Sequence, residues 1–221
     1  MKRNFRVLLA GLGLIGLPLL LTPGCSSIYN TTMEHVFGYE KRELLRKSVT
    51  ALQAEQKDAQ KEFTDALTQI KALYAFDGGK LETFYGKMKT ASERCESQAE
   101  EVRSRIEKME KIARSMFAEW EKELQQYSNP NLATASREQL HQTRERYAQL
   151  AQTVRAAEAS MQPVLSQLKD NVLFLKHNLN AAAIGSLQGE AAGIQQQIEV
   201  LLQQMNASIA ESDRFIQSLP K

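Results

Sequence analysis

Long runs of apolar residues spaced alternately three and four positions apart constrain the fold of this chain more than any other feature. The first run is broken only by the polar Gln56, and its members are Leu45, Val49, Leu52, Gln56, Ala59, Phe63, Ala66, Ile70 and Leu73. Heptad spacing of this kind lines one face of a helix with apolar side chains, and that face requires a neighbouring helix to cover it. The first run therefore predicts a long coiled-coil helix that ends near residue 75.

Three later segments repeat the pattern, over residues of about 80–127, 136–179 and 181–216. The second run consists of Leu81, Phe84, Met88, Ala91, Cys95, Ala99, Val102, Ile106, Met109, Ala113, Met116 and Trp120. The last run consists of Ile184, Leu187, Ala191, Ile194, Ile198, Leu201, Met205, Ser208 and Ile216. Pro163 lies inside the third segment, where a proline removes a helical hydrogen bond, so we expect a kink there.

Turn residues are scarce between these segments. Pro130 and Pro163 are the only prolines between Cys25 and Pro220, whereas a sandwich or a doubly wound sheet needs many more turns. The sequence therefore predicts an all-α fold: an elongated antiparallel helical bundle, or coiled coil, of about four long helices over residues 39–219.

Residues 1–24 have the features of an export leader. Lys2, Arg3 and Arg6 precede an apolar run of about 15 residues, 7–21, which is the length of a signal-peptide core. A membrane-spanning helix needs about 20 apolar residues. We therefore expect a cleaved signal peptide over 1–24, followed by a tether with a short helix over 25–38.

Cys25 directly follows this leader in the sequence LTPGCSS. Small residues before a cysteine at this point resemble the bacterial lipobox, although Thr22 stands where a leucine is usual. The resemblance implies that Cys25 is acylated and anchors the chain to a membrane. Ser26 after the cysteine implies, in a cell with two membranes, the outer membrane facing the periplasm. The alternative is an ordinary secretory signal, with Cys25 as a plain thiol.

The charge of the chain without its leader excludes some partners. Three of the 28 basic residues lie in the leader, so 28 − 3 = 25 basic residues face 26 acidic ones, a net charge of −1. Basic and acidic residues also alternate along the helices. We therefore expect no nucleic-acid partner, because such proteins carry a basic surface.

No pattern of residues indicates chemistry. His35, His141 and His177 are far apart and have no metal-ligand spacing, and neither a phosphate-binding loop nor a nucleophile elbow is present. The expectation is a chain that is not an enzyme and has no catalytic residues, metal, cofactor or small-molecule substrate. An enzyme whose titratable residues come together only in the fold is a minor alternative.

Two local features have more than one interpretation. Cys95 lies within the second apolar run, so we expect it to be buried; the alternative is a reactive thiol. Gly185, Gly189 and Gly193 are spaced four residues apart in the last helix, where each glycine costs about 1 kcal/mol relative to alanine. We expect them to allow close helix packing within the bundle; contact with a partner and a frayed helix start are the alternatives.

Three stretches are similar to one bacterial family. Residues 72–82 (ALYAFDGGKLE), 174–181 (FLKHNLNA) and 186–190 (SLQGE) resemble proteins of the domain of unknown function 2959. The similarity extends over nearly the whole chain after Cys25. It implies an envelope-associated coiled-coil protein of unassigned activity, and it supplies no catalytic residues.

These observations predict a membrane-anchored coiled-coil lipoprotein of the bacterial envelope with a structural or scaffolding role. Its expected partners are the membrane, through the lipid on Cys25, and envelope proteins or further copies of itself. The alternative function is a lipid-contacting or membrane-remodelling bundle, which requires a basic or apolar exposed face.

Overall fold

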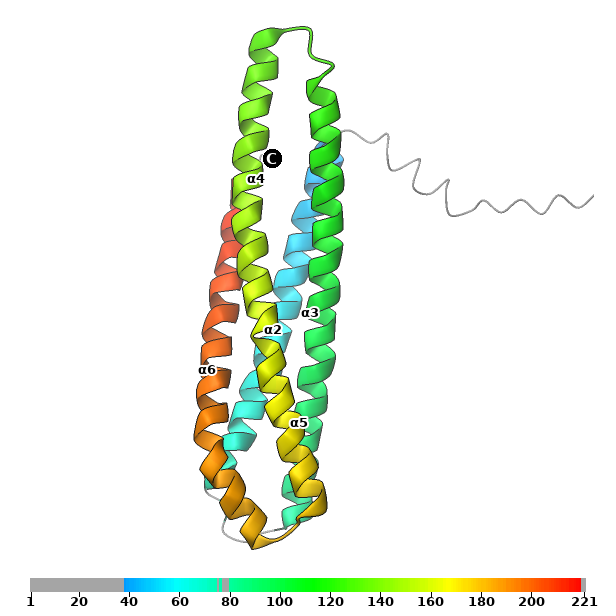
Figure 1. The fold of residues 1–221 in the computed structure, drawn as a ribbon. Helices are drawn as coiled ribbons and strands as arrows, with labels where there is room; N and C mark the ends of the chain where they lie inside the picture. The colour runs from blue at the N-terminus through cyan, green and yellow to red at the C-terminus, as the bar shows by residue number, and fades with distance from the viewer. Residues whose placement is uncertain (1–37, 75, 77–79, 220–221) are drawn as a thin grey trace, which may run out of the picture. The chain divides into compact units, whose positions relative to one another are not determined.

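The computed structural model describes residues 38–74, 76 and 80–219, which form an all-α bundle (Figure 1). Its helices are α2 (Gly38–Tyr74), α3 (Leu81–Leu124), α4 (Pro130–Ala159), α5 (Met161–His177) and α6 (Ala181–Ser218). Only Ser160 separates α4 from α5, so the five helices form four long rods. No strand occurs among the described residues. The predicted fold class is confirmed.

Successive rods run in opposite directions, and each packs against two others (Figure 1). Helix α2 contacts α3 and α6, while both α4 and α5 also contact α3 and α6. Helix α2 therefore lies diagonally across the bundle from the α4–α5 rod. The seams of all four rods converge on one core between them.

The predicted seams form this core. Every member of the first run, from Leu45 to Leu73 and including Gln56, is completely buried. In the second run only Leu81 and Trp120 keep partial exposure. In the last run Phe215 is buried in place of its neighbour Ile216, which stays partly exposed. The heptad pattern thus identified the core-facing sides of α2, α3 and α6.

The third rod differs from its prediction at its start. Helix α4 begins at Pro130, six residues before the expected 136, because two signals act there together. The Asn129 side chain accepts hydrogen bonds from the backbone N–H groups of Asn131 and Leu132, and Pro130 occupies the first helical position, where a proline loses no helical bond.

The expected kink near Pro163 is confirmed as a break at Ser160, three residues earlier. Pro163 then falls in the first turn of α5, where its missing N–H has no helical partner to lose. The break divides the rod without ending it, and its two halves, α4 and α5, both stay on α3 and α6.

Different polar contacts hold different pairs of helices together. Helix α3 is joined to its neighbours by ion pairs, which are Lys41–Glu119 (2.8 Å), Glu55–Arg105 (2.8 Å), Arg103–Glu158 (2.9 Å), Glu110–Arg155 (2.8 Å) and Glu121–Arg144 (2.6 Å). Helices α2 and α6 are joined by one ion pair, Lys71–Glu199 at 3.6 Å, and mainly by amide side chains, since Gln53, Gln56, Gln60 and Gln188 each donate a hydrogen bond across that interface.

No helix in the described part of the chain has an apolar stretch long enough to cross a membrane. The predictions of a signal peptide, of acylation at Cys25 and of a tether with a short helix fall on residues 1–38. Of these residues the structure describes only Gly38, where α2 begins, so these expectations stay predictions.

Candidate functional site

The hairpin formed by α3 and α4 extends past the ends of the other two rods (Figure 1). The guanidinium of Arg146 reaches the carbonyl of Ser218 at 3.4 Å, so the last turn of α6 lies beside Arg146. The sixteen residues of α4 before Arg146, 130–145, therefore continue beyond the end of α6. Within residues 120–139, which we call the hairpin tip, Leu124 is the one buried side chain.

A cleft of about 360 Å³ lies at the base of the hairpin tip. Arg42 of α2, Trp120 and Tyr127 from the α3 side, and Leu132 and Gln139 of α4 line this tip cleft. Met116, Glu123, Ala135 and Ser136 complete its walls. Its volume falls at the lower end of the range that ligand and peptide pockets occupy.

Contacts on two sides hold the Trp120 ring in place. The indole N–H donates a hydrogen bond of 2.9 Å to the Oγ of Ser136, which joins α3 to α4. The Arg42 guanidinium lies 5.3 Å from the centre of the indole ring, at the distance of a cation–π interaction. The indole is therefore fixed before any partner arrives.

Apolar and polar side chains line the cleft together, and two of the large apolar ones are well exposed to solvent. Tyr127 is 43 % exposed and Leu132 is 56 % exposed, and Arg42 and Glu123 supply one charge of each sign. Trp, Tyr and Arg are the residue types that contribute most to protein–protein binding. The arrangement is suited to receiving an apolar side chain of a partner, with polar groups at the rim to orient it.

The sequence prediction missed this site. The heptad pattern includes Trp120 only as the last packing residue of the second run, and it predicts the chain reversal between the segments that end near 127 and begin near 136. The missed signal is that the spacing continues past Trp120, since Leu124 and Tyr127 follow it at steps of four and three, and a further apolar residue, Leu132, comes directly after the turn. Nothing in the heptads shows that α6 ends short of this point.

Cys95 lies where its register predicts and is completely buried. Burial, followed by the negative charges of Glu62 and Asp65, raises the pKa of the thiol to about 12. A thiol with this pKa stays protonated at neutral pH and is a poor nucleophile. The buried interpretation of Cys95 is confirmed.

The glycines of α6 do not pack against the bundle. Gly185, Gly189 and Gly193 are exposed, and a methyl group added at any of them would meet no other atom within 4 Å. The expectation of close packing within the bundle is therefore wrong, because the glycine positions lie outside the register of the buried Leu187 and Ile194. Packing against a partner chain stays a prediction.

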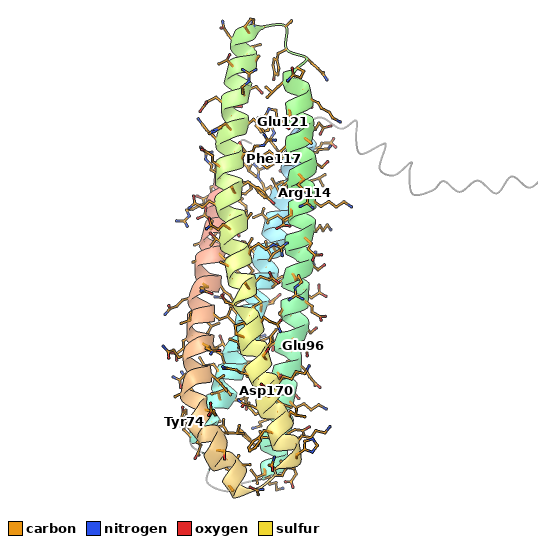
Figure 2. All side chains as sticks on the ribbon, in the orientation of Figure 1. Tyr74, Glu96, Arg114, Phe117, Glu121 and Asp170 are labelled. Atoms are coloured by element: carbon orange, nitrogen blue, oxygen red, sulfur yellow. The ribbon has the colours of Figure 1, made fainter. Side chains whose placement is uncertain are left out.

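No group of three His, Cys, Asp or Glu side chains among the described residues is placed to hold a metal ion. His141 and His177 are exposed and lie on different helices, while His35 lies outside the described residues. Figure 2 shows the charged side chains spread over the outer faces of the rods. The structure thus does not bring His141 and His177 together, and the titratable groups that meet across the described helices do so as ion pairs of opposite charge.

Comparison with known proteins gives one match. The family model described as protein of unknown function (DUF2959) matches residues 29–219. Neither the curated proteins nor the solved structures contain a match. The matched residues include all five described helices and both tip-cleft walls, so the chain belongs to the DUF2959 family of proteins of unknown function.

Proposed function

We propose that this chain is a lipid-anchored coiled-coil protein of the bacterial envelope that acts as a scaffold, and that it binds a protein partner at the tip cleft. The observation that carries the proposal is the fixed Trp120 beside the exposed Tyr127 and Leu132. A side chain held in one rotamer loses little conformational entropy on binding, which favours affinity for a given contact area.

The exposed surface of the hairpin tip favours a protein partner over a small ligand. Its two helices project from the bundle with a single buried side chain, Leu124, so most of their surface is available for contact. Helices gain most of their stability from tertiary packing. A partner that covers the tip would bury Tyr127 and Leu132 and add the packing that the tip lacks.

The anchoring part of the proposal rests on the sequence near Cys25. A basic start, an apolar run of about 15 residues and small residues before the cysteine support acylation. The proposed location is the envelope, at the outer membrane facing the periplasm. The lipid would keep the bundle at the membrane, and the tip cleft would then select the protein that is held there.

The test is site-specific photo-crosslinking in cells, with the crosslinking residue placed at the exposed Gln139 of the cleft. Capture is compared between the unsubstituted bundle and the double variant Tyr127→Ser with Leu132→Ser. The matched control is Tyr74→Ser with Leu173→Ser, since that pair has the same residue types and similar exposures of 49 % and 54 %. A third strain carries Cys25→Ser.

We expect a discrete crosslinked partner that the tip variant loses and the control variant keeps. Cys25→Ser should reduce capture by releasing the chain from the membrane. Equal capture by the tip variant and the wild type would refute the tip cleft as the binding site. Loss of capture in the control variant as well would show that the effect is not specific to the tip cleft and would also refute it.

A further inference from the structure

The two parts of α6 are seated on different surfaces. Over residues 183–205 every buried side chain is apolar, namely Ala183, Ile184, Leu187, Ala191, Ile194, Ile198, Leu201 and Met205. Over residues 206–219, which we call the C-terminal turns, the buried set includes Ser208, Glu211 and Ser212 beside Phe215 and Leu219. The character of the interface thus changes from apolar to largely polar after Met205.

The stretch of α2 that faces the C-terminal turns carries polar contacts beside the buried Val49 and Leu52 of its seam. Gln56 is completely buried and donates a hydrogen bond of 2.7 Å to the Oγ of Ser208. Gln53 donates to the Oδ1 of Asp213 at 2.6 Å. The other amide atom of Gln56, its carbonyl Oε1, is buried with no hydrogen-bond partner. Water would satisfy this oxygen if the turns moved away, so its burial disfavours the closed state.

The Tyr147 ring of α4 packs between α3 and the same turns, with its centre 5.6 Å from that of the Phe117 ring and 6.0 Å from that of the Phe215 ring. Glu211 forms its ion pair with Arg214 of the same helix, so this pair fastens nothing across the interface. Apolar contact here comes from Phe215 and Leu219, with the partly buried Ile216.

We propose that the C-terminal turns of α6 open as one cooperative unit while residues 183–205 stay packed. Opening hydrates the Gln56 carbonyl, which offsets part of the loss of Phe215 and Leu219 from the core. Because α2 and α4 do not contact each other, the movement leaves a slot between them.

The slot continues the tip cleft. Arg42 of α2 and Gln139 of α4 line the cleft. One turn further along α2, Arg46 donates a hydrogen bond to the Leu219 carbonyl. Two turns further along α4, Arg146 donates one to the Ser218 carbonyl. The closed turns therefore cover one end of a longer groove. Their opening is a property of this chain and does not depend on the proposed partner.

Amide hydrogen exchange of the full chain, followed residue by residue, tests the opening. We expect the amides of residues 208–216 to share one opening equilibrium and to exchange about 100-fold faster than those of residues 190–202. Ordinary fraying would instead give protection that rises steadily from Ser218 inward. A steady gradient of that kind would overturn the proposal.

Two sets of variants test its cause. Gln56→Leu with Ser208→Ala makes the seat apolar and should slow exchange of residues 208–216 about tenfold, without changing residues 190–202. Should that double variant not fold, exchange of residues 208–216 is measured in Ser212→Ala, where we again expect it to be slower. The Ser212 hydroxyl is buried and bonds to the Ser208 carbonyl of its own helix. The control Ser186→Ala removes the same local bond at an exposed site. If exchange is unchanged in Ser212→Ala, or changes equally in the control, then the polar side chains buried under the C-terminal turns are not the cause of the opening.

Discussion

Replacing Gly185, Gly189 and Gly193 together by alanine should stabilise the fold. Each glycine lies on the exposed face of α6, and an added methyl group meets no atom within 4 Å, so no clash opposes the change. Glycine in a helix interior costs about 1 kcal/mol relative to alanine. The three positions share no partner, so their effects should add, to about 3 kcal/mol in the free energy of unfolding.

Thermal unfolding followed by circular dichroism measures this change. For a domain of this length about 1 kcal/mol shifts the melting temperature by roughly 2–4 °C, so the triple variant should melt roughly 6–12 °C higher. The matched control is Ala192→Gly, an exposed position of the same helix, which should lower the free energy of unfolding by about 1 kcal/mol. Gly86→Ala in α3, which also has no neighbour within 4 Å, should raise it by the same amount.

A triple variant that melts at or below the wild-type temperature would refute this reasoning, since it would show that the glycines contact something in solution. Sedimentation of the same samples separates the two explanations. If the glycine face packs against another copy of the chain, the wild type assembles and the alanine variant does not. If the face is open to solvent, both have the same oligomeric state and only the melting temperature differs.

Three other measurements address the core. Cys95 should resist thiol reagents at pH 8 in the native protein and react only after unfolding, because burial holds its pKa near 12; fast native labelling would contradict this. Gln56→Leu with Ser208→Ala removes the buried oxygen without a partner together with both partners of the Gln56–Ser208 hydrogen bond, so it should raise the free energy of unfolding by about 1 kcal/mol; a lower value in urea unfolding would show that the amide is fully satisfied. Hydrogen bonds from Arg155 lower the pKa of Glu110, so the stability that this pair contributes is fully present above about pH 4.3 and is lost as the pH falls through the lowered pKa. Glu110→Gln should therefore weaken the dependence of urea unfolding on acid pH.

The core was predictable because heptads report burial directly. Every residue from Leu45 to Leu73 in the first run is buried, and Cys95 lies in register as expected. The glycine error also has a clear cause: spacing of four residues places side chains on one face but does not say which face. Comparison with the seam register of Leu187 and Ile194 would have placed the glycines on the outer side.

The tip cleft could not be predicted in the same way. Its existence depends on where α6 ends relative to α4, and helix lengths along the sequence do not fix the axial offset between rods. Asn129 and Pro130 start α4 six residues before the expected residue 136, so the projecting hairpin is longer than the sequence predicts. The heptads show that a helix requires a neighbour, but not how far along the helix that neighbour reaches.

The position of Trp120 gives the protein a built-in optical probe. It is the only tryptophan in the chain, so excitation near 295 nm, where tyrosine absorbs little, reports almost entirely on the tip cleft. The indole is partly exposed, with Arg42 over its ring and its N–H bonded to Ser136. Emission wavelength and quenching by iodide or acrylamide therefore follow occupation of one site in the folded protein, without any label.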